Sequence, residues 1–103
     1  MIRIPLPQRL KVGGHTYSIE TSAKINAELN SRNAWGLHNA TFRRIQLDTS
    51  SSEAQFSQAA LHEFLHAVDT VYSDGNLSDL TVSTLSEGLL QILEQLGVRL
   101  VKR

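Results

Sequence analysis

The chain has 103 residues, no cysteine and a formal net charge of zero with histidine neutral, and its pI is near 6.9. A chain of this length is expected to form a single domain, residues 1–103, and its balanced charge gives no reason to expect nucleic acid or an anionic membrane as a partner. Without cysteine, disulfides and thiolate metal sites are excluded, so any metal ligand must be His, Asp or Glu.

The first thirty residues predict extended segments followed by an ambiguous stretch. Residues 2–4 form a short extended segment, which the prolines at positions 5 and 7 stop. Residues 9–20 alternate around Gly13-Gly14, which predicts a β-hairpin. Residues 23–31 fit either a short helix or a loop. No stretch resembles a secretion signal or approaches a membrane span, so a soluble cytoplasmic protein is expected.

The rest of the chain predicts two strands and then two long helices. Residues 35–38 and 43–48 read as strands joined by a turn, and residues 98–101 as a last strand or an extended tail. The first helix is expected over 53–72, opened by the capping-box spacing of Ser50 and Glu53. The second is expected over 79–96, between Ser78 as N-cap and Gly97 as stop.

The apolar positions of the second helix are expected to form its buried stripe. They are Val82, Leu85, Leu89, Ile92, Leu93 and Leu96. Strands followed by helices predict an α+β domain, with two long helices on one side of a small, mostly antiparallel sheet.

The first helix carries the sequence His62-Glu63-Phe64-Leu65-His66, which has the pattern H-E-x-x-H. Residues four apart share a helix face, so His62 and His66 are expected to aim their imidazoles at one point, as two ligands of a zinc ion. Glu63 lies at the edge of that face, where it is expected to hold a zinc-bound water and take its proton.

The surroundings of the motif favour a metal site. Most of the helix between Phe56 and Tyr72 is apolar, which predicts a central place in the core. Three polar side chains on its remaining strip need partners, because burying each without one costs about 1–3 kcal/mol. The simpler alternative is an amphipathic helix whose polar face happens to have this pattern.

The third ligand is expected to be a carboxylate. Glu87, 21 positions after His66 and in the second helix, is the first choice, although it lies opposite the expected buried stripe and could belong to a solvated face. Asp69 shares the histidine face but lies about 10 Å along the axis from His62, which suits an orienting role better. Asp74 and Asp79, in or near the turn, are the remaining candidates.

Two stretches give the chain a family resemblance that covers roughly residues 35–96. Residues 61–68 (LHEFLHAV) and 85–93 (LSEGLLQIL) resemble small phage- and prophage-encoded metallopeptidases, similar in layout to the ImmA/IrrE-type peptidases of mobile elements and to gluzincins. The resemblance implies a zincin-like domain, with zinc bound by His62, His66 and Glu87 and with Glu63 as general base. Some relatives carry a glutamate one turn earlier, where this chain has Ser83.

Two functions follow from these expectations. The first is a zinc-dependent peptidase whose peptide or protein substrate adds to the sheet edge near residues 35–38. The second is a zinc-containing protein-binding module without hydrolysis. Tyr17, His38 and Tyr72 are the candidates for steadying a tetrahedral intermediate, although core packing or an exposed strand position explains each more simply.

Overall fold

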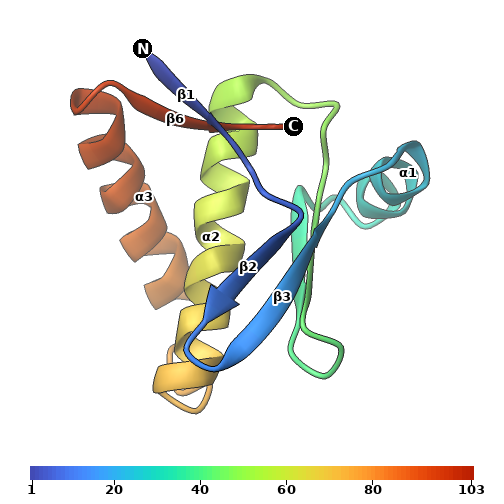
Figure 1. The fold of residues 1–103 in the computed structure, drawn as a ribbon, viewed down its shortest axis with the longest axis vertical. Helices are drawn as coiled ribbons and strands as arrows, with labels where there is room; N and C mark the ends of the chain where they lie inside the picture. The colour runs from blue at the N-terminus through green and yellow to red at the C-terminus, as the bar shows by residue number, and fades with distance from the viewer.

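The computed structural model describes residues 1–103 as three helices and two sheets (Figure 1). Residues 23–31 form a helix, which settles the ambiguity left by the sequence. In chain order, the elements are β1 (Ile2–Pro5), β2 (Arg9–Val12), β3 (His15–Glu20), α1 (Ala23–Ser31), β4 (Gly36–Asn39), β5 (Arg44–Leu47), α2 (Glu53–Tyr72), α3 (Asp79–Gln95) and β6 (Val98–Val101).

The main sheet has the strand order β2-β3-β5-β4 and is mixed. The β2–β3 hairpin turns at Gly13, whose φ of +60° suits glycine, and β4 pairs antiparallel with β5. The pair at the centre, β3–β5, is parallel. After α1, the chain forms β4 at the outer edge of the sheet and then turns back. Strand β5 therefore lies between β4 and β3 and runs parallel to β3. The expectation of one mostly antiparallel sheet is therefore wrong.

The second sheet joins the two ends of the chain. Strands β1 and β6 pair in parallel, with Ile2 opposite Val98, and both lie at the end of the molecule that carries the two termini (Figure 1). The hydroxyl of Ser57 on α2 accepts a hydrogen bond from the Leu100 N–H at 3.1 Å, which ties β6 to α2. Residues 98–101 thus form the strand that the sequence left as one of two alternatives.

Helix α2 covers the main sheet and supplies much of the core. It begins at Glu53 as expected, but Ser52 rather than Ser50 is its N-cap, accepting from the Gln55 N–H. Ser50 instead donates to the Asp48 carboxylate. The buried cluster between α2 and the sheet contains Tyr17, Ile19, Ile45, Leu47, Phe56, Ala60 and Ala67.

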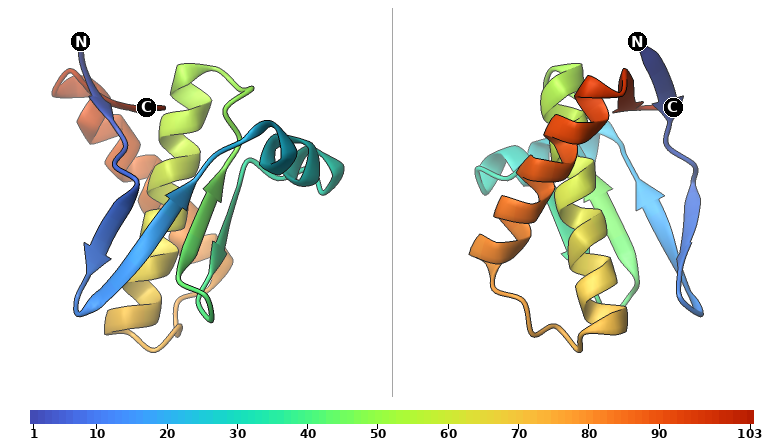
Figure 2. Two further views of the ribbon diagram at one scale, coloured as in Figure 1. Left: turned by 45° about the vertical axis from the view of Figure 1, so that its right-hand side comes forward. Right: turned by 90° about the vertical axis from the view of Figure 1, so that its left-hand side faces the viewer.

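Helix α3 packs on α2 and not on the main sheet, because α2 lies between them (Figure 2). Ser78 caps it and Gly97, with φ of +74°, follows its end, as expected. Its expected buried stripe is largely wrong. Val82 is buried, whereas Leu85, Leu89, Ile92 and Leu96 are 41–68% exposed. Only the side of α3 that carries Val82 and Ser86 reaches α2. No helix of the protein has both the length and the apolar character that crossing a membrane requires.

Candidate metal centre

The structure brings His62, Glu63 and His66 together on one face of α2. Their ligand atoms all lie within 4.8 Å of one another, and the Nε2 atoms of the two histidines are 3.1 Å apart. The two rings meet edge to face, with centroids 4.7 Å apart. This is the arrangement that the i, i+4 spacing predicts for an uninterrupted helix.

These residues fit a zinc ion. Two nitrogens 2.0–2.1 Å from zinc in a tetrahedral arrangement are roughly 3.3 Å from each other, close to the 3.1 Å between the two Nε2 atoms. Burial lowers the pKa of His62, and the neighbouring His66 lowers it further. At neutral pH this imidazole is therefore uncharged, as metal binding requires.

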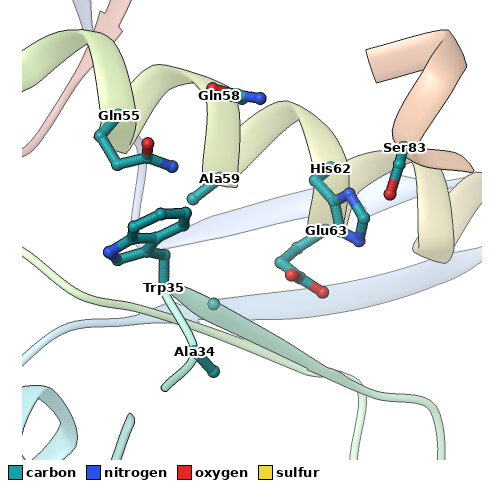
Figure 3. Close-up of a pocket in the computed structure, with 9 residues that line it drawn as sticks. Ala34, Trp35, Gln55, Gln58, Ala59, His62, Glu63 and Ser83 are labelled. Atoms are coloured by element: carbon teal, nitrogen blue, oxygen red, sulfur yellow. The ribbon is translucent and has the colours of Figure 1, made fainter. Parts of the chain in front are cut away.

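Glu63 is buried between α2 and β4 and has no counter-ion. Its side chain lies against Gly36, where a Cβ atom would be 2.9 Å from the Glu63 Cγ and 3.0 Å from its Oε2. The carboxylate has no hydrogen-bond or ion-pair partner within the protein and opens into a cavity shared with His62 (Figure 3). Burial, with a smaller contribution from the charge of Asp79, raises the pKa of Glu63 to about 7.

Gly36→Ala is expected to displace the Glu63 carboxylate, because the new methyl group would also lie 3.1 Å from Leu47 Cδ2. Overpacking of this kind lowers the free energy of unfolding by about 1–3 kcal/mol, which urea denaturation measures. Gly88→Ala is the control: on α3 nothing lies within 4 Å of the new Cβ, so it should stabilise by about 0.5–1 kcal/mol. Equal effects of the two substitutions would show that Gly36 is not a close contact.

The carboxylate of α3 that approaches the histidines is Asp79. Its Oδ1 lies 3.7 Å from His66 Nε2, although its side chain is 95% exposed. Glu87 is also exposed, and neither Asp79 nor Glu87 belongs to the His62–Glu63–His66 group. Helix α3 runs back along α2, so Asp79 is level with His66 and Ser83 lines the cavity beside His62. Glu87 lies about 12 Å along the axis from Asp79, eight residues further on.

The other acidic candidates lie elsewhere. Asp69 is buried, and its Oδ1 accepts from the Leu77 N–H at 3.2 Å while its backbone oxygen accepts from Ser73 and Gly75. It therefore holds the loop between α2 and α3. Asp74 is in that loop and lines a separate cavity with Arg43.

His38 is a third histidine at the site. From the sequence it was one of three candidates for stabilising a tetrahedral intermediate. It shares a sheet face with Gly36 two residues earlier, and its ring is nearly parallel to that of His66, with centroids 6.1 Å apart. The Tyr17 hydroxyl lies 3.1 Å from His38 Nε2. Burial, then the charge of His66, lowers the pKa of His38. Tyr72, by contrast, is 69% exposed and lies near Gly13.

Comparisons with known proteins add no relative to this site. No family model matches the chain, and no curated protein or solved structure matches it either. The resemblance to metallopeptidases therefore depends on the sequence motifs, and the function has to be inferred from the residues of the cluster themselves.

Proposed function

We propose that the chain is a zinc-dependent peptidase, with His62 and His66 as metal ligands and Glu63 as general base. The observation that carries this proposal is the buried Glu63 carboxylate, which opens into a cavity beside two imidazoles whose Nε2 atoms are 3.1 Å apart and has no partner within the protein. Burial of the side chain raises the pKa of this carboxyl, while its oxygens still reach the cavity. A purely structural metal site has no use for an acid held in this way.

The chemistry divides between the metal and the protein. Zinc, when bound, supplies a Lewis acid that polarises a carbonyl and lowers the pKa of a coordinated water. Glu63 takes the proton from the attacking water and delivers it to the leaving amine. The Glu63 side chain packs directly on Gly36, in space that a Cβ atom at position 36 would occupy. His38, which Tyr17 contacts at 3.1 Å, lies beside His66 and is the neutral group placed to steady charge on the carbonyl oxygen.

For the third ligand, we assign Asp79 ahead of Glu87. Ligands of one zinc ion lie about 3.3 Å apart, and the Asp79 Oδ1 to His66 Nε2 distance of 3.7 Å is close to that value. Asp79 lies outside the group whose ligand atoms are all within 4.8 Å of one another, so its exposed side chain would have to swing toward the histidines to complete the site.

An extended peptide suits the edge of the main sheet. Strand β4 pairs only with β5, so its other edge has free backbone donors and acceptors. Gly36 and His38 of this strand line a cavity with His62 and His66. A peptide that adds to β4 by backbone hydrogen bonds would pass directly across the candidate metal centre.

Metal analysis tests the proposal. Wild-type protein is expected to hold about one zinc ion per chain, and His62→Ala and His66→Ala are each expected to lose it. Asp79→Ala should weaken zinc binding by at least about tenfold, measured by competition with a chelating dye, and Glu87→Ala should leave it unchanged. Equal zinc content in the wild type and both histidine variants would contradict the proposal. The reverse order of Asp79 and Glu87 would restore Glu87 as the ligand.

A further inference from the structure

A cavity of about 310 Å³ opens beside Glu63, between α2 and the segment that leads into β4 (Figure 3). Its volume is at the lower end of the range for ligand sites, about 300–1,000 Å³, and suits one side chain better than a whole peptide. We call it the Trp35 pocket. Its walls are Ala34, Trp35, Gln55, Gln58, Ala59 and Ser83, and Gly36, His62 and Glu63 close the end next to the candidate metal centre.

Trp35 gives this pocket a flat apolar surface. Its side chain is 54% exposed, so the protein's own packing leaves much of the indole uncovered. In Figure 3 the indole lies beneath Gln55 and Ala59, with the Glu63 carboxylate further along the same cavity. Planar groups stack on such surfaces with offset or edge-to-face geometry.

The walls of the Trp35 pocket are uncharged. Gln55 and Gln58 supply neutral amides, and no Lys, Arg or Asp contributes to the lining. Glu63, at the inner end, is the only ionisable acid. An anionic side chain entering the pocket would lose water without gaining an opposite charge from the walls, which is unfavourable. A cationic side chain could pair only with Glu63, and only while that carboxyl is ionised. The pocket therefore discriminates by charge as well as by shape.

We propose that the Trp35 pocket receives an aromatic side chain of the peptide substrate, stacked on Trp35 next to the bond that is cleaved. This inference rests on the proposed peptidase function for its biological meaning. The binding of the side chain itself needs neither metal nor hydrolysis, so the two proposals can fail separately.

Fluorescence tests the pocket directly, because Trp35 is the only tryptophan of the chain. The protein used is Glu63→Gln, which removes both hydrolysis and the one acid of the pocket. It is titrated with the N-acetyl amides of phenylalanine, lysine and aspartate. The phenylalanine amide is expected to give a saturable change in Trp35 emission and to bind at least about tenfold more tightly than the other two.

A charge substitution at the wall supplies the second measurement. Gln58→Glu, added to Glu63→Gln, is expected to tighten binding of the lysine amide several-fold and to weaken binding of the aspartate amide. Gln91→Glu is the matched control, since Gln91 is exposed on α3 and outside the pocket walls, and it should leave the order unchanged.

Three outcomes would overturn the pocket proposal. They are no saturable response to the phenylalanine amide, equal affinities for all three amides, and equal effects of Gln58→Glu and Gln91→Glu. Zinc content and hydrolysis of the wild type, measured separately, decide the peptidase proposal.

Discussion

Glu63→Gln is expected to lower the rate of peptide hydrolysis by a factor of about 10²–10⁴ and to leave zinc binding intact. Glutamine has nearly the same shape as glutamate, so it can take the same place against Gly36. It cannot accept the proton of the attacking water. His62 and His66, whose Nε2 atoms are 3.1 Å apart, keep their geometry.

The measurement pairs kcat on a mixed fluorogenic peptide substrate with zinc content of the same preparation. Glu28→Gln is the control, because it removes an exposed carboxylate of α1 that lies outside the cluster. If Glu63→Gln loses the metal, Glu63 is a ligand and the mechanism is wrong. If the wild type holds zinc and hydrolyses nothing, the zinc-containing binding module becomes the better account.

The sequence predicted the part of the site that depends on local geometry. A helix places residues four apart on one face whatever surrounds it, so His62 and His66 meet as expected. The position of Glu63 followed from the same helix. Its burial against Gly36 did not, because it depends on how β4 packs on α2.

The partners from other elements were harder to predict, because they depend on the register of α3 along α2. The length of chain between the helices favours Glu87, which stays an untested prediction. The Leu77 N–H donates to Asp69 and so fixes the loop over 73–78, and this loop brings Asp79, the first residue of α3, level with His66. No periodic pattern in the sequence encodes that register.

For the fold, the positions of the helices and strands were predicted, but the pairing of the strands was not. Element positions followed from periodicity and capping, and most helix and strand bounds agree closely with the structure. The parallel pairing of β3 with β5 and of β1 with β6 joins segments far apart in the chain. Helix α3 is apolar on more than one side, so its sequence alone did not reveal that only the side with Val82 is buried.

The metal-free protein is expected to lose stability, relative to Glu63→Gln, as the pH rises from about 4.5 to 7. The buried Glu63 has a pKa of about 7 in the folded protein, compared with an ordinary value of 4.5. A raised pKa means that the folded state holds the proton more tightly than the unfolded state does. This contribution to stability is therefore fully present below pH 4.5 and is lost as the pH rises through 7.

The size of this effect follows from the shift. A displacement from 4.5 to about 7 corresponds to about 3 kcal/mol between the two ends of the pH range, an upper value because the carboxylate reaches solvent through the cavity. Urea denaturation with a chelator present measures it, in wild type and Glu63→Gln at each pH. His38 and His62 titrate in both proteins, so the difference between the two curves isolates Glu63. Parallel curves would mean that Glu63 ionises in the folded protein as easily as in water, and its role as a buried base would be lost.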